Sequence, residues 1–277
     1  MEATNIYGHA LAAHLVEQGQ TVSIVNPSRI KGYAQSQLSR TKNDRADAKL
    51  IAHFCRDLKP HAWQPLPESL EVLQCMARRW QELEKMITQE SNRKERFEKK
   101  PELRVEIEAH IKFLKEQKKT RKKLMRKHFK THDDLAQQRD LLTSIPSIAE
   151  QTAMLLLAEL GDISRFRCAR QVAAFAGLTP RERLSGTSVR GKSRLSKLGN
   201  RHLRRVLYYP ALTALRCCEP FQMLRSRLLA AGKTKMQAVG AVMHKLSRVV
   251  FGVLKSGTPF EPDLLITPQH TPEPIAS

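Results

Sequence analysis

Two aspartates, Asp44 and Asp47, lie three residues apart within the segment TKNDRADAKLIA (41–52). Positions three apart share one face of a helix, so both carboxylates could bind one hard cation such as Mg²⁺. The same spacing also fits a capping box, in which Asp44 caps the helix and an acid follows three residues later. The spacing alone therefore leaves a metal pair and an ordinary helix start both open.

A third carboxylate and a serine offer further chemistry. Glu2 directly precedes a segment of helical pattern, where a carboxylate also suits the positive end of the helix dipole. Ser185 precedes a glycine in a basic segment, where arginines could stabilise a developing alkoxide and hold a phosphate for attack. A serine beside glycine is equally an ordinary turn residue that bonds its own backbone. Tyr208 and Tyr209 are alternative nucleophiles, but their apolar helical surroundings predict core positions.

The segment 178–205 is strongly basic. Between residues 181 and 205 there are nine Lys or Arg and a single acid, Glu182, with three glycines spaced among them. Glycines let the main chain approach a phosphate backbone closely, and the cations neutralise its charge. We expect nucleic-acid contacts from Arg181, Arg183, Arg190, Lys192, Arg194, Lys197, Arg201, Arg204 and Arg205.

A second basic block, residues 112–130, holds ten Lys or Arg and one Glu. Such a face can be solvated helix surface, but an imbalance this large favours phosphate contact. The whole chain of 277 residues carries 48 Lys plus Arg against 27 Asp plus Glu, a formal charge of +21. Nucleic acid is therefore the predicted partner.

Neither a membrane nor an oxidising compartment is indicated. No apolar run approaches the roughly 18 residues that span a bilayer, and the N-terminus has no signal-peptide pattern. The five cysteines form no Cys-x-x-Cys pair and are odd in number, so we expect them to be reduced and mostly buried. These features predict a cytoplasmic protein.

Hydrophobic periodicity predicts a helix over 7–18, a short strand over 21–27 that ends at Asn26-Pro27, and a helix from about Thr41 to Arg56. Residues 68–142 are rich in helix formers, with Pro101 as the main break, which predicts two long helices packed as a hairpin or coiled coil.

The C-terminal part is apolar and helical in pattern. Residues 145–149 have the outline of a helix-hairpin-helix turn, but Ser147 and Ala149 occupy the positions where glycines would let a phosphate approach. We therefore expect an ordinary helical hairpin there. Residues 235–256 predict an amphipathic core helix, and the proline-rich end from 258 to 277 predicts a disordered tail.

Four segments along the chain are distinctive in combination: MEATNIYG, IVNPSRIKGYAQSQLSRTKNDRADAKLIA, AAFAGLTPRERLSGTSVRGKSRLSKLGNRHLRRVL and AVGAVMHKLSRVVFGVLKSGTPF. Together, and in this order, they resemble the bridge-RNA-guided transposases of the IS110 and IS1111 insertion sequences. The resemblance implies a RuvC-like, RNase H-type N-terminal domain with an Asp-Glu-Asp-Asp metal site, a coiled-coil linker for dimer contacts, and a helical domain with a nucleophilic serine.

Matched position by position, Glu2 is similar to the family's glutamate, Asp44 and Asp47 to its last two aspartates, and Ser185 to its serine. The resemblance thus implies Mg²⁺ as cofactor, DNA and a structured guide (bridge) RNA as partners, and a homo-oligomer. The family's first aspartate lies well upstream of the glutamate, and this chain begins one residue before Glu2. Either the start is misplaced or this is an N-terminally truncated copy; in both cases we expect the chain as given to lack the first strands of its sheet and to be inactive alone.

The expected fold is mainly α, in four parts. Residues 1–58 form a partial RuvC-like α/β domain, 59–140 a helical coiled-coil linker, 141–257 a helical transposase domain with the serine loop, and 258–277 the tail. The expected function is a DNA transposase or recombinase that breaks and rejoins DNA with a metal-carboxylate site and Ser185 under guide-RNA direction. The alternative is a catalytically dead nucleic-acid-binding remnant. A junction nuclease that uses carboxylates alone is disfavoured by the basic serine-glycine segment.

Overall fold

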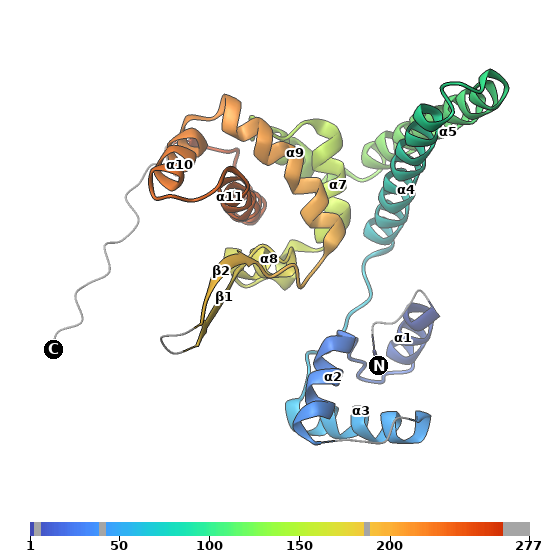
Figure 1. Cartoon of the computed structure of the whole chain (residues 1–277). Coiled ribbons are helices and arrows are strands. Elements are labelled where there is room, and N and C mark those ends of the chain that lie inside the picture. The colour runs from blue at the N-terminus through green and yellow to red at the C-terminus, as the bar shows by residue number, and fades with distance from the viewer. Residues whose placement is uncertain (3–6, 39–42, 186–188, 263–277) are drawn as a thin grey trace. The chain divides into compact units, whose positions relative to one another are not determined.

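The computed structural model describes residues 1–2, 7–38, 43–185 and 189–262. The chain divides into two compact units, Met1–Pro67 and Glu68–Ser277, each described here by itself (Figure 1). The secondary structure of the described residues is mainly helical, as the sequence predicts. None of the helices in these ranges combines the length and apolar character needed to cross a membrane.

The first unit is a small cluster of short helices. Its core consists of Val25, Ile30 and Phe54, all buried, with the ring of Tyr33 packed edge-on against Phe54 at 5.6 Å between centroids. Its helices are α1 (Tyr7–Glu17), α2 (Pro27–Ser36) and α3 (Asp44–Leu58). The helix predicted over 7–18 is confirmed as α1. The helix predicted from about Thr41 to Arg56 is α3, which begins at Asp44 after its N-cap Asn43. Thr41 itself lies outside the described residues.

The predicted strand over 21–27 does not form a sheet ladder. Val25 makes an isolated parallel bridge with Glu2, and its N–H donates to the Met1 carbonyl at 2.9 Å. On the other side, the Trp63 N–H donates to the Val22 carbonyl at 2.6 Å. One short segment with a few bonds to its neighbours, two of them to Met1, is not a sheet, which needs several paired strands. A RuvC-like α/β sheet is therefore not evident in the described part of this unit.

The sequence Asn26-Pro27 begins a helix, although we predicted that it only ends a strand. The Asn26 side-chain oxygen accepts a hydrogen bond from the Ser28 N–H at 2.9 Å, which caps α2. Pro27 occupies the first turn of α2. Backbone N–H groups in a first turn have no acceptor within the helix, so proline loses no hydrogen bond there, and its fixed φ suits a helix. The prediction was wrong because the same two residues serve as a strand stop and as a helix start.

The second unit begins with two long helices, α4 (Glu68–Arg96) and α5 (Pro101–Lys130). They form the helical hairpin that the sequence predicts, with the break before Pro101. Ion pairs from Lys94 to Glu108 at 2.8 Å and from Lys118 to Glu84 at 3.1 Å link the two helices. The coiled-coil alternative stays a prediction.

The remaining helices of this unit pack around two apolar ones, α7 and α11. Of the eleven residues of α7, eight are buried, and α11 contacts α6, α8, α9 and α10. The predicted core helix over 235–256 is thus confirmed. The elements are α6 (Asp133–Thr143), α7 (Glu150–Leu160), the 3₁₀ turn η1 (Ile163–Arg165), α8 (Ala169–Phe175), β1 (Pro180–Ser185), β2 (Val189–Leu195), α9 (Arg201–Cys217), α10 (Glu219–Ala230) and α11 (Lys235–Ser256).

Several sequence expectations need correction in this unit. The strands β1 and β2 were not predicted, because their Arg, Lys, Ser and Gly residues lack the apolar alternation by which strands are recognised. Tyr209 is 73% exposed and Tyr208 half-buried, so the expected core positions are wrong. Cys75, Cys168 and Cys217 are also exposed rather than buried. The tail prediction falls largely on 263–277, outside the described residues.

A buried carboxylate links α7 to the start of α9. Glu159 is only 1% exposed, and its Oε2 accepts a hydrogen bond from the Asn200 side-chain amide at 2.9 Å, across 41 residues of sequence. The Asn200 oxygen in turn caps α9 by accepting from the N–H groups of His202 and Leu203 at 2.8 and 3.0 Å. The other Glu159 oxygen lies 3.9 Å from Arg78 Nε. Asn200 therefore joins a helix cap to a buried charge.

Replacing Glu159 by Ala should lower the free energy of unfolding by about 3 kcal/mol, because it leaves the Asn200 amide without its partner and opens a cavity. Urea denaturation followed by circular dichroism measures the loss. The control is Glu106→Ala on the exposed surface of α5, which should change stability by less than about 0.5 kcal/mol. Equal effects of the two substitutions would contradict the assignment of Glu159 as a structural anchor.

Candidate nucleic-acid interface

The basic segment folds as an antiparallel hairpin of β1 and β2. Its register pairs Pro180 with Leu195 at the base and Ser185 with Val189 at the far end, with an irregularity between Arg181 and Arg183. Ser185 is thus the last residue of β1, next to residues 186–188, which lie outside the described residues. The predicted serine loop is therefore the end of a two-stranded ribbon (Figure 1).

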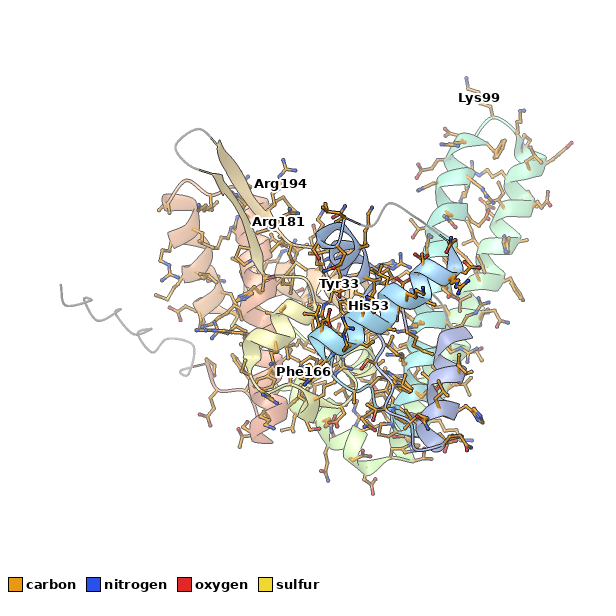
Figure 2. The ribbon with its side chains drawn as sticks, turned by 90° about the horizontal axis from the view of Figure 1, so that it is seen from below. Tyr33, His53, Lys99, Phe166, Arg181 and Arg194 are labelled. Carbon is orange, nitrogen blue, oxygen red and sulfur yellow. The ribbon has the colours of Figure 1, made fainter. Side chains whose placement is uncertain are left out.

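Two arginines face each other across this hairpin. Arg181 pairs directly with Arg194, and both side chains are exposed (Figure 2). Like charges directly opposite each other on a sheet are destabilising. A phosphate between or beside them would remove that repulsion, so the pair favours binding of an anion. The backbone register adds Arg183 opposite Gly191 and Arg190 opposite Leu184 farther along the ribbon.

The other predicted contact residues follow the hairpin and differ in environment. Arg204 donates from Nη1 to the Ala176 carbonyl at 2.9 Å and to the Lys197 carbonyl at 3.3 Å. Burial lowers the pKa of this guanidinium, which thus has a structural role within the protein. Arg205 lies 3.7 Å from Glu84, whereas Arg201 and Lys197 are exposed. Their contacts with nucleic acid stay predictions.

Backbone hydrogen bonds hold the base of the hairpin against the end of α8. The Asn200 N–H donates to the Phe175 carbonyl at 2.6 Å, and the Lys197 N–H donates to the Gly177 carbonyl at 3.1 Å. Gly199 has φ of +143°, and a Cβ atom there would lie 2.3 Å from the Phe175 carbonyl oxygen. Only glycine permits this close approach of two backbone segments. The hairpin is thus anchored on the helical core.

A histidine on α9 extends this anchor to α4. The His202 Nδ1 lies 2.8 Å from the Gln81 side-chain oxygen, and Gln81 is 4% exposed. Burial lowers the pKa of His202, while the nearby Glu159 charge opposes this shift. A neutral His202 that donates from Nδ1 to the Gln81 oxygen satisfies the geometry. The sequence does not single out Gln81 or Glu159, because a buried Gln and a buried Glu on helices carry no distinguishing pattern.

The two aspartates lie at the start of α3, but they do not cap it. The N-cap is Asn43, whose side-chain oxygen accepts from the Ala46 N–H at 2.8 Å. The expected capping box is therefore wrong by one position. Asp44 is exposed and Asp47 half-exposed, and within the described residues neither carboxylate has a recorded hydrogen bond or ion pair.

The described carboxylates do not fit a metal site as they stand. Among the residues that the structure describes, no group of three His, Cys, Asp or Glu side chains could hold a metal ion. Glu2, Asp44 and Asp47 therefore do not converge, and a hard cation prefers several fixed oxygens. The Mg²⁺ assignment stays a prediction. Ser185 belongs to the other unit, so the structure does not relate it to these acids.

Comparison with known proteins gives matches along most of the chain. Residues 139–225 match the Transposase IS116/IS110/IS902 family, and residues 1–97 match the DEDD transposase of IS110 elements. The pilin gene-inverting protein of Moraxella bovis is 30% identical over 94% of this chain and 81% of its own length. The chain belongs to the IS110/IS1111 family of transposases. A DEDD transposase domain implies catalysis that depends on a divalent metal.

Further relatives of this transposase carry related names. The pilin gene-inverting protein of Moraxella lacunata is also 30% identical, over 94% of this chain and 81% of its own length. The transposase of insertion sequence IS1328 from Yersinia enterocolitica is 26% identical over 91% of this chain and 82% of its own length. The similarity thus extends through both units, and it confirms the predicted family and the transposase class of enzyme.

Replacing Gly199 by Ala should destabilise the transposase by at least about 2 kcal/mol, because the new methyl group would collide with the Phe175 carbonyl and the backbone has positive φ. The matched control is Gly232→Ala, where φ is +73° but nothing lies within 4 Å of the added Cβ. That substitution should cost only the backbone strain, about 1 kcal/mol. Chemical denaturation of both variants compares the two costs. Equal losses would show that the close contact at the hairpin base is unimportant.

Proposed function

We propose that this transposase breaks and rejoins DNA through Ser185, under the direction of a structured guide RNA. The carrying observation is the hairpin, which places a serine at the end of a ribbon with a facing arginine pair, Arg181 and Arg194. The hydrogen bonds at the hairpin base support this role, since a nucleophile must be held in a reproducible position to attack a phosphate.

The proposed reaction conserves the number of phosphodiester bonds. The Ser185 Oγ attacks phosphorus and releases its proton, an Oγ–P bond forms, the bond to the leaving deoxyribose oxygen breaks, and that oxygen takes up the released proton. A hydroxyl of the incoming strand then attacks the phosphoserine, which restores the serine hydroxyl. Arginines on the ribbon would stabilise the negative charge that accumulates on the phosphoryl oxygens in both steps.

The other components of the proposal rest on family resemblance. Glu2, Asp44 and Asp47 are proposed as carboxylates of the Mg²⁺-dependent domain on that resemblance alone, since the described side chains do not come together as a group of three ligands. The metal would supply charge stabilisation at a phosphoryl group. We also propose that the protein acts as a homo-oligomer, in the cytoplasm where the chromosome is accessible.

A second candidate function is a nucleic-acid-binding remnant without catalytic activity. It is favoured by one observation: the described carboxylates do not form a metal site. It retains both basic segments and therefore predicts the same affinity for DNA. The two candidates differ only in whether strand exchange occurs.

Ser185→Ala should abolish strand exchange while changing DNA affinity by less than about twofold, since one hydroxyl is lost and no charge changes. The assay follows recombination of labelled DNA with Mg²⁺ and the guide RNA, and affinity is measured by fluorescence anisotropy. Ser193→Ala, on the opposite strand of the same hairpin, is the matched control and should remain active.

The same two measurements on the wild-type protein distinguish the two candidate functions. Tight DNA binding without any strand exchange would favour the remnant. Exchange that persists in Ser185→Ala would move the nucleophile elsewhere, and the exposed Tyr209 would be the next residue to replace.

A further inference from the structure

A groove with four lysines lies where α4, α5 and the first turn of α7 meet. Its volume is about 300 Å³, at the lower end of the range of roughly 300–1,000 Å³ for ligand pockets. No residue of the hairpin lines it. The residues of this lysine groove are Trp80, Ile87, Lys115, Lys118, Lys119, Lys122 and Gln151.

The four lysines form a stripe along α5. Positions 115, 118, 119 and 122 have the three- and four-residue spacing that places side chains on one helix face. From Lys115 to Lys122 the helix rises about 10 Å. One strand of a nucleic acid carries a phosphate about every 3.4 Å along a helical axis, so the stripe spans about three phosphates.

Lys118 is fixed in place by two neighbours. Its ammonium lies 4.2 Å from the centroid of the Trp80 ring and 3.1 Å from a Glu84 oxygen. Trp80 itself is only 5% exposed, so its ring contacts Lys118 but offers little surface for base stacking. Any ligand of the groove is therefore bound through charge rather than through aromatic stacking.

The other three lysines are less compensated than Lys118. Among the described residues, Lys115, Lys119 and Lys122 have no side-chain hydrogen bond and no ion pair within 4 Å, and Glu150, whose charge interacts with that of Lys122, is already paired with Arg126. Lys115 and Lys119 are exposed and Lys122 is half-buried, so all three charges can reach an anion that lies beside the apolar surfaces of Trp80 and Ile87.

Glu84 connects the groove to the basic segment 181–205. One of its carboxylate oxygens pairs with Lys118 on α5, and the other lies 3.7 Å from Arg205 on α9. The basic blocks 112–130 and 181–205, far apart in sequence, thus meet at one acid.

We infer that the lysine groove binds the phosphate backbone of a single nucleic-acid strand, at a site separate from the hairpin. The stripe runs along one face of α5 and is short, so it contacts only a few phosphates of one strand. Since no base-reading group lines it except the Gln151 amide, binding is largely independent of sequence. The site does not depend on Ser185 as nucleophile, so it can be tested independently of the proposed reaction.

The test replaces three groove lysines together, as Lys115→Gln, Lys119→Gln and Lys122→Gln. The matched control is Lys85→Gln, Lys99→Gln and Lys100→Gln, which removes the same charge from exposed positions of the α4–α5 hairpin outside the groove and outside both basic blocks. The probes are oligo(dT) and oligo(U) of about 12 nucleotides, a length within the range that single-strand sites cover. Affinity is measured for the full chain between low and high salt.

Loss of three phosphate contacts should make the negative slope of log binding constant against log salt less steep by about 2. It should also weaken binding about 100-fold at 0.1 M salt. The control variant should lose less than about threefold. A loss with oligo(dT) only, with oligo(U) only, or with both supports the groove and identifies which sugar it accepts. Equal behaviour of the two triple variants with both probes would overturn the inference.

A second measurement uses the wild-type protein and does not depend on how the variants fold. Acetylation of lysines by a small reagent, read by mass spectrometry, should slow at Lys115, Lys119 and Lys122 when an oligonucleotide is bound. Lys85, Lys99 and Lys100 should react at unchanged rates. Uniform protection of all six lysines, or none, would contradict a localised site.

Discussion

The hydrogen bond between Glu159 and Asn200 is the interaction on which the second unit depends. A carboxylate that is 1% exposed is costly to bury, so its partner must be held in place. Asn200 meets this requirement because its oxygen caps α9 while its amide binds Glu159. The same residue donates its backbone N–H to Phe175 at the end of α8. Three helices and the hairpin base therefore converge on one residue, Asn200.

This arrangement explains how a chain of charge +21 forms both a packed core and basic surfaces. The apolar helices α7 and α11 hold the core together, and the cations lie on elements attached to its outside: the hairpin and the lysine face of α5. Net positive charge repels itself in a compact protein, and polyanion binding relieves this repulsion. Nucleic acid is thus expected to stabilise this transposase as well as to be its substrate.

Sequence patterns predicted the helices well and the site less completely. The long hairpin of α4 and α5 and the core helix α11 follow from periodicity and from the break at Pro101. The ribbon carrying Ser185 was missed because its strands are polar, although the segment SGTS between two such runs is a turn signal. The capping box at Asp44 was misplaced by one residue, since Asn43 is an equally good cap. No local pattern could predict Glu159, Gln81 or the meeting of two basic blocks at Glu84, because these depend on packing between distant helices.

The most direct test of this account is a double-mutant cycle of Glu159→Ala and Asn200→Ala, with unfolding free energies measured by urea denaturation. If the two side chains act through their mutual hydrogen bond, the cost of the double variant should be smaller than the sum of the single costs by about 1–3 kcal/mol. The helix cap lost in Asn200→Ala appears on both sides of the cycle and cancels. Strictly additive losses would contradict the claim that this buried pair holds α7, α9 and the hairpin base together.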